Sequence, residues 1–129
     1  MSMTVERQIE LDASPESVWD AVCAPETWLA DEGSLDIRPG GDGVLTDDGV
    51  TRRVVVETVV VGRRLVYRWW RDDEGDASRV EITVVAGGGP TRLVVRETRL
   101  AGPTARLSAA HRWEVRLTCL AFLGALARV

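Results

Sequence analysis

Few residues in this chain have the type and spacing that acid–base chemistry requires. Its one histidine, His111, is the natural general base near neutral pH. It lies near the start of the helix expected over residues 106–129, nearly half a turn away from the apolar side of that helix. A solvated or capping role is therefore favoured. The acidic pair Asp31 and Glu32 could line the mouth of a cavity, but no partner of fixed spacing supports acid–base work. We therefore favour a protein without catalytic residues, and a hydrolase or lyase-like enzyme stays open as an alternative.

Metal and phosphate sites are not predicted either. Cys23 and Cys119 lack a short metal-ligand spacing, and a chain with one histidine cannot supply a usual zinc site. Residues 39–43 form a Gly-rich turn, but a phosphate cradle needs a helix directly after the glycines, and here a strand is expected. We predict no metal and no cofactor.

Charge and length limit the partners and the compartment. The net charge of -4 and the pI of about 5.0 argue against capture of nucleic acid or anionic lipid, which depends on a basic patch. No apolar run approaches the ~20 residues of a membrane span, and Glu6 and Arg7 lie where a signal peptide would be apolar. We expect a cytoplasmic protein, with no nucleic-acid or membrane partner and with residues 1–129 as a single domain.

The element expected to position everything else is a long helix over residues 106–129. At ~1.5 Å per residue it would extend for roughly 35 Å, enough to cross a small sheet. One apolar stripe follows helical spacing and needs a partner inside the fold: Trp113, Leu117, Leu120 and Gly124. A second stripe lies opposite: Val115, Cys119, Phe122 and Leu126.

The remainder predicts two short helices and an antiparallel sheet. Ser14 is an expected N-cap before Pro15, and Pro25 would open a second short helix that continues through Leu29. Strands are expected over residues 4–11, 35–38, 44–45, 52–61, 65–72, 79–86 and 91–100.

A two-residue turn at Gly62 and Arg63 would make Val60 face Leu65 and Val56 face Trp69. The same register places a stripe of alternating charge on the outer, solvated face: Glu57, Arg68, Glu81 and Arg96.

The inner face of this sheet carries one carboxylate, Glu97. A buried carboxylate without a partner is costly, so Glu97 must pair, reach solvent at the strand end, or serve a ligand. Of these three, exposure at the strand end is the outcome that the sequence favours.

The order of these motifs resembles the START or birch-pollen-allergen-type helix-grip superfamily, also called SRPBCC. More narrowly it resembles the branch named for the activator of the heat-shock-protein-90 ATPase. The resemblance rests on residues 14–22, 25–29, 38–41 and 62–69, and on Trp113 followed by Leu117, Leu120 and Leu123. It implies an α+β helix-grip fold, with a curved antiparallel sheet of six to seven strands around the C-terminal helix and two short helices between the first and second strands. It also implies a bacterial protein, often with a cavity for a small apolar molecule.

Three functions follow as hypotheses. The first is non-enzymatic binding of a small, largely apolar ligand between the sheet and the last helix, with a stress-related setting as an open expectation. Its candidate lining is Trp19, Trp28, Tyr67, Trp69, Glu97, Trp113 and Leu117, although the tryptophans could equally fill the space as core. The second is a homodimeric protein-interaction or co-chaperone-like module, with Val115, Cys119, Phe122 and Leu126 at the interface. These four residues could equally pack within the chain, against the loop around residues 101–103. The third is the enzyme considered above.

Overall fold

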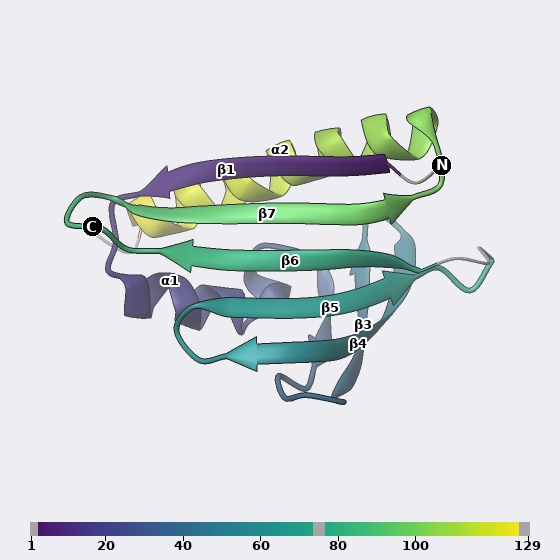
Figure 1. The fold of residues 1–129 in the computed structure, drawn as a ribbon, viewed down its shortest axis with the longest axis horizontal. Coiled ribbons are helices and arrows are strands. Elements are labelled where there is room, and N and C mark those ends of the chain that lie inside the picture. Colours follow the sequence, from purple (N-terminus) through teal and green to yellow (C-terminus); the bar gives the residue numbers. More distant parts are fainter. Residues whose placement is uncertain (1–2, 74–76, 127–129) are drawn as a thin grey trace.

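The fold is a curved antiparallel sheet that wraps around a long helix (Figure 1). A computed structural model describes residues 3–73 and 77–126, with side chains described as far as Phe122. The strands are β1 (Met3–Leu11), β2 (Glu32–Leu35), β3 (Asp42–Asp47), β4 (Val50–Val60), β5 (Arg64–Trp70), β6 (Ser78–Val85) and β7 (Thr91–Leu100). The helices are α1 (Pro15–Val22), the 3-10 turn η1 (Pro25–Thr27) and α2 (Pro103–Leu126).

The strands form one seven-stranded sheet in the order β1-β7-β6-β5-β4-β3-β2, and every neighbouring pair is antiparallel. Figure 1 shows α2 behind β1 and β7, on the same side of the sheet as α1. The predicted helix-grip fold is confirmed, including the two short helical segments between the first two strands. Among the described residues, no helix is both long enough and apolar enough to cross a membrane.

The entry into α1 follows from local sequence. The Ser14 side chain accepts a hydrogen bond from the backbone N–H of Ser17 at 3.1 Å, and Pro15 occupies the first helical position. Both features match the prediction. The following turn is shorter than expected, because η1 ends at Thr27 and Trp28 turns inward to donate its indole N–H to the Ala21 carbonyl at 2.9 Å.

The two sides of α2 have the exposure expected from their spacing. Trp113, Leu117 and Leu120 are buried against the sheet, while Val115 and Phe122 are 45% and 64% exposed. Cys119 is half-buried. Gly124 and Leu126, the last members of the two predicted stripes, lie beyond Phe122, so their burial is outside what the structure describes.

The expected strand over residues 35–38 is wrong. β2 lies earlier and ends at Leu35, where the chain turns toward β3. Gly33 and Gly43 allow this pairing, because a Cβ at either position would come within 2.2 Å of a backbone oxygen on the opposite strand. The short strand is therefore defined by close backbone approach and not by apolar alternation.

The predicted register of β4 against β5 is also wrong. Residues 61–63 form a three-residue loop, so Val60 pairs with Arg64, not Leu65. A bulge between Val56 and Thr58 adds a second shift, so Val56 pairs with Tyr67, and Trp69 pairs with Val54.

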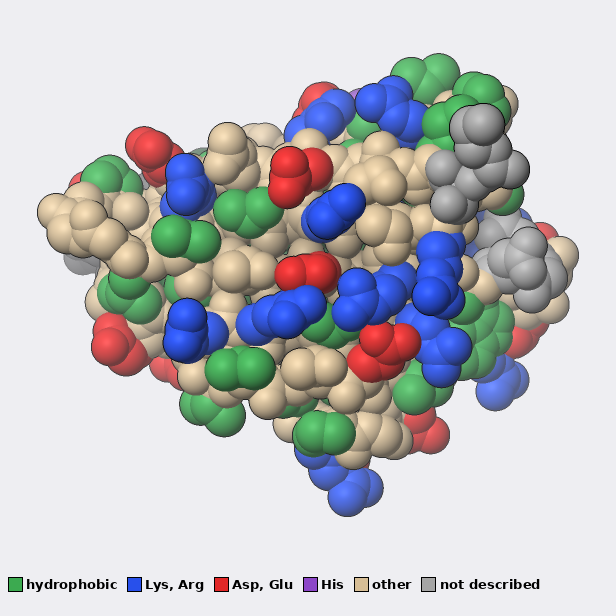
Figure 2. All heavy atoms as spheres, viewed as in Figure 1, with side chains coloured by type: hydrophobic (Ala, Val, Ile, Leu, Met, Phe, Trp, Pro, Cys, Tyr) green, Lys and Arg blue, Asp and Glu red, His purple; other side chains and the backbone are tan. Residues whose placement is uncertain are grey.

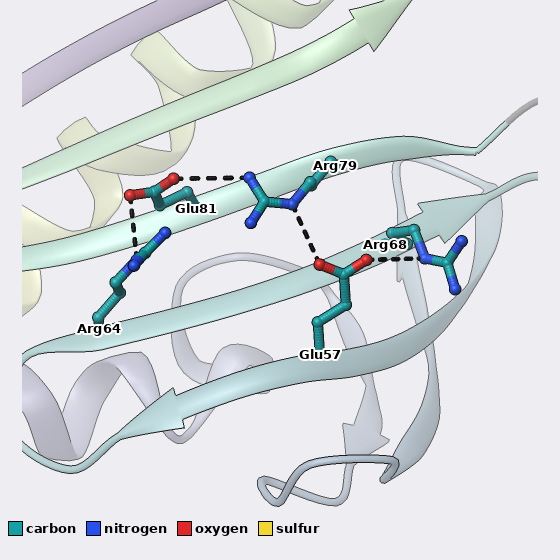
Figure 3. Close-up of polar contacts among 5 residues, drawn as sticks. All are labelled: Glu57, Arg64, Arg68, Arg79 and Glu81. Carbon is teal, nitrogen blue, oxygen red and sulfur yellow. Dashed lines mark hydrogen bonds and ion pairs between the residues drawn. The ribbon is translucent and has the colours of Figure 1, made fainter.

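The outer face carries the predicted mixture of charges with different partners. Figure 2 shows acidic and basic side chains interspersed over this face. In Figure 3, Glu57 pairs with Arg68 and Arg79, each at 3.0 Å, while Glu81 pairs with Arg64 at 3.0 Å and Arg79 at 3.7 Å. Such exposed pairs contribute little individually, about 0–1 kcal/mol each. Arg68 was predicted to face Glu81, but it lies opposite Arg79, and Arg79 forms an ion pair with Glu81.

Candidate ligand-binding site

Glu97 is the polar centre of the space between the sheet and α2. It is 1% exposed and accepts four hydrogen bonds. One oxygen accepts from the Trp69 indole at 2.9 Å and the Ser78 hydroxyl at 2.5 Å. The other accepts from the Trp113 indole at 2.9 Å and the Arg112 guanidinium at 2.5 Å. The expected exposure at the strand end is therefore wrong, because donors from β5, β6 and α2 converge on this carboxylate.

The aromatic side chains around Glu97 pack against one another. The Trp69 and Trp113 rings stack at a centroid distance of 5.9 Å. Trp113 also contacts Trp28, at a centroid distance of 6.4 Å. Tyr67 meets Trp69 edge-on at 5.5 Å. These rings are buried, so the middle of the space beneath α2 is occupied by side chains.

The Tyr67 hydroxyl is a buried polar group without a hydrogen-bond partner among the described residues. Burial, and then the nearby charge of Glu97, raise the pKa of Tyr67 well above its usual value. The phenol is therefore a neutral part of the core and is poorly suited to act as a base.

A pocket lies at one end of the sheet, where β5 and β7 end and α2 begins (the right-hand end of Figure 1). Its volume is about 650 Å³. Trp69 and Glu97 form part of its lining, and Trp70, Leu100 and Pro103 add apolar surface. Four arginines also line it: Arg52, Arg71, Arg99 and Arg112.

Two of these arginines contact the aromatic cluster. The guanidinium of Arg52 lies 5.0 Å from the centre of the Trp69 ring, and that of Arg112 lies 5.1 Å from the same ring. Arg112 also holds Glu97, and its Nε is buried without a hydrogen-bond partner in the part of the chain that the structure describes. The inner wall of the pocket is thus both cationic and aromatic.

Arg99 owes its position to an irregularity in β7. Met3 pairs with Leu100 while Val5 pairs with Glu97, so β7 holds one more residue than β1 over this stretch. Arg99 has a φ of 64°, in the left-handed region that residues other than glycine rarely adopt. Bulges of this kind redirect side chains and are common beside functional sites.

A shallower hollow of about 470 Å³ lies next to this pocket, beside the middle of α2. Arg116 on α2 forms ion pairs with Asp31, at 3.1 Å, and with Asp47. The Asp48 backbone N–H, and then Arg116, lower the pKa of Asp31 below its usual value. This cluster fastens α2 to the β2–β3 region. The exposed His111 lies at its edge.

Comparison of the sequence with known protein families agrees with this fold, in which a curved sheet wraps around a long helix. The family described as Activator of Hsp90 ATPase homolog 1-like protein matches residues 12–123. The chain belongs to this family. No curated protein sequence matches the chain at a significant level.

Solved structures of similar fold include several bacterial proteins. MLL2253 from Mesorhizobium loti is 22% identical, with a TM-score of 0.84 over 98% of each chain. DynU16, from the dynemicin biosynthetic locus, is 24% identical with a TM-score of 0.82; the match covers 92% of this chain but only 45% of DynU16. An Aha1 protein from Colwellia psychrerythraea, solved as a dimer, is 13% identical with a TM-score of 0.81 and covers 92% and 93% of the two chains. At these identities the likeness concerns the fold.

Within this activator-like family fold, the predicted lining residues divide into two groups. Trp69 and Glu97 line the pocket. The others are buried in the core: Trp19, Trp28, Tyr67, Trp113 and Leu117. Sequence reasoning missed Trp70 and the four arginines. The position of Arg112 could have been inferred from the sequence, because this residue directly precedes Trp113 in the helix. The position of Arg99 could not, because the bulge that holds it has no local sequence signature.

Proposed function

We propose that the protein is a non-enzymatic binding module for a small molecule, held in the pocket at the end of the sheet where α2 begins. The observation that carries the proposal is the pocket of about 650 Å³ with Trp69 in its wall. This volume lies in the range of about 300–1,000 Å³ that is usual for small-molecule sites.

In this proposal the ligand lies away from the middle of the space between the sheet and α2. The stacked rings of Trp69 and Trp113 occupy the centre, and Glu97 is fully engaged by its four donors. A ligand would therefore rest on the outer edge of the aromatic cluster, against Trp69 and Trp70. Its body would be apolar where it meets Leu100 and Pro103. The stress-related setting stays a prediction.

The test is a titration with N-phenyl-1-naphthylamine, a neutral aromatic dye whose fluorescence rises in apolar sites. We expect saturable one-to-one binding. Ser108→Trp would fill the pocket, because Ser108 lines it from the exposed face of α2. This variant should bind the dye roughly tenfold or more weakly, because the dye would lose apolar contacts that contribute about 1.4 kcal/mol of binding free energy.

The matched control is Leu107→Trp. Leu107 is 67% exposed on the same turn and does not line the pocket. It should bind the dye as the wild type does. The proposal would be contradicted if neither this dye nor its sulfonated analogue binds, or if both tryptophan variants bind the neutral dye with unchanged affinity.

A second function is supported by the exposed side of α2. Val115 and Phe122 present apolar surface, and beside them Thr27, Trp28 and Cys119 line a groove of about 440 Å³. Exposed apolar patches on soluble proteins often mark interfaces. The dimeric Aha1 protein from Colwellia psychrerythraea shows that this fold can pair. We propose a homodimer through this surface as the alternative, an interaction module that would leave the pocket accessible.

Its test is the molar mass in solution at high micromolar concentration. Phe122→Asp should convert a dimer to a monomer, because a buried unpaired carboxylate is costly. Val61→Asp is the control, since Val61 is 80% exposed on the β4–β5 loop and far from this surface in sequence. A wild-type monomer, or a dimer unaffected by Phe122→Asp, would contradict this second proposal.

A further inference from the structure

We infer that the pocket selects an amphipathic organic anion, a molecule with an apolar body and one carboxylate, sulfonate or phosphate group. This inference rests on the proposed function and names the ligand class for the same site. It follows from the charge of the pocket wall, the strained position of Arg99 and the beginning of α2.

The pocket wall is basic although the chain as a whole is acidic. The net charge of the protein is -4, yet four arginines and one carboxylate line the pocket among the described residues. That carboxylate, Glu97, already accepts four hydrogen bonds, one of them from Arg112. Arg71 is held by Asp73 through two hydrogen bonds of 3.0 and 2.8 Å. The local field therefore favours an anion against the charge of the whole molecule.

Arg99 is the cation best placed to meet such an anion. It is exposed at the pocket, and the bulge in β7 holds it with a φ of 64°. Glycine or asparagine would adopt this backbone more readily, so a long cationic side chain here works against local stability. Strain of this kind is concentrated at functional sites.

The beginning of α2 adds further donors to the same wall. The backbone N–H of Arg106 donates to the Gly102 carbonyl at 2.9 Å, which makes Gly102 the residue that precedes the first turn. Glycine has no side chain to cap that turn. Thr104 and Ala105 of the first turn line the pocket, at the positive end of a 24-residue helix.

The apolar part of the ligand has its own surface. Trp70, Leu100, Pro103 and Ala105 line the pocket beside the arginines. A simple inorganic anion would leave this surface unused, whereas a purely apolar molecule would bury guanidinium groups without compensation. An amphipathic anion satisfies both parts.

The test compares two dyes that differ by one charged group. 8-Anilinonaphthalene-1-sulfonate is N-phenyl-1-naphthylamine with a sulfonate added, so the ratio of their affinities isolates the charge. At fixed ionic strength we expect the sulfonate to bind roughly tenfold or more tightly, as charge-assisted hydrogen bonds predict. Competition by 1-naphthoate and by 1-naphthyl phosphate then distinguishes a carboxylate from a phosphate ligand.

A pair of arginine variants assigns the effect to the pocket. Arg99→Gln should weaken binding of the sulfonate dye by roughly 10- to 100-fold and leave the neutral dye within about twofold. Arg96→Gln removes the same charge from an exposed position on the same strand outside the pocket, and should change neither affinity.

The outcomes separate this inference from the proposed function. Equal affinities for the two dyes overturn the inference and leave the pocket standing, while binding of neither dye overturns both. Equal losses for both dyes in Arg99→Gln would mean that Arg99 supports the shape of the pocket, and would also overturn the inference.

Discussion

Replacement of Glu97 by glutamine should be among the most destabilising single changes in the part of the chain that the structure describes. Each carboxylate oxygen of Glu97 accepts two hydrogen bonds. An amide group keeps one oxygen and replaces the other with a donor. If the amide nitrogen faces β5 and β6, the Ser78 hydroxyl can rotate to accept, but the Trp69 indole N–H has no acceptor. The Arg112 guanidinium also loses its counter-charge.

The expected cost follows from these losses. Glu97 is 1% exposed and the Arg112 side chain 14% exposed, so water cannot readily replace the missing partner. Breaking a buried ion pair by removing one partner costs about 3–5 kcal/mol. For a domain of 129 residues this corresponds to a fall in Tm of roughly 10–20 °C.

Urea unfolding followed by tryptophan fluorescence measures this effect, with m-values compared to confirm that the same surface is exposed. Glu57→Gln is the matched control, because Glu57 also pairs with two arginines but has a side chain that is 30% exposed. It should cost at most about 1 kcal/mol. A Glu97→Gln variant that loses no more stability than Glu57→Gln would contradict the stabilising role of the buried Glu97–Arg112 pair.

Two further predictions concern single residues. Tyr67 is the only tyrosine, so absorbance near 295 nm reports its ionisation alone. Because burial raises the pKa of Tyr67, the phenol should stay protonated in the folded protein above pH ~10, and stability should fall as pH rises from the unfolded-state pKa toward the raised one. Tyr67→Phe should remove the part of the alkaline fall in stability that comes from this phenol. At neutral pH it should leave the free energy of unfolding unchanged or raise it, since no hydrogen bond is lost. A fall in that free energy of more than about 1 kcal/mol would contradict this. Arg99→Asn should leave stability unchanged or raise it by up to about 1 kcal/mol, because asparagine tolerates the left-handed backbone; a lower urea midpoint would mean that Arg99 supports the fold.

The elements that the sequence predicts well are those with local signals. Ser14 and Pro15 form a helix start that depends on neighbouring residues alone. The spacing of Trp113, Leu117 and Leu120 identifies the buried side of α2 in the same way. The β4–β5 register failed because a two-residue and a three-residue loop at Gly62 differ little in sequence, and the bulge beside Glu57 leaves the apolar alternation almost unchanged.

The site was less predictable because its contacts join distant segments. The inward direction of Glu97 followed from strand parity, but its donors include Arg112 and Trp113, which approach only after α2 has docked. The exposed strand end expected for Glu97 was wrong for this reason. Arg99 lies in the pocket through a bulge that depends on the pairing of β7 with β1. Neither feature is encoded by spacing along the chain.

The most direct test of the binding proposal is an NMR titration of the nitrogen-15-labelled protein with 8-anilinonaphthalene-1-sulfonate. The five tryptophans give separate indole N–H signals, which act as reporters spread through the molecule. Binding in the pocket predicts shifts of the Trp69 and Trp70 indoles and of the backbone amides of Gly102, Thr104 and Ala105. Shifts centred instead on Trp28, Thr118 and Phe122 would place the ligand in the groove beside the exposed side of α2 and contradict the proposed site.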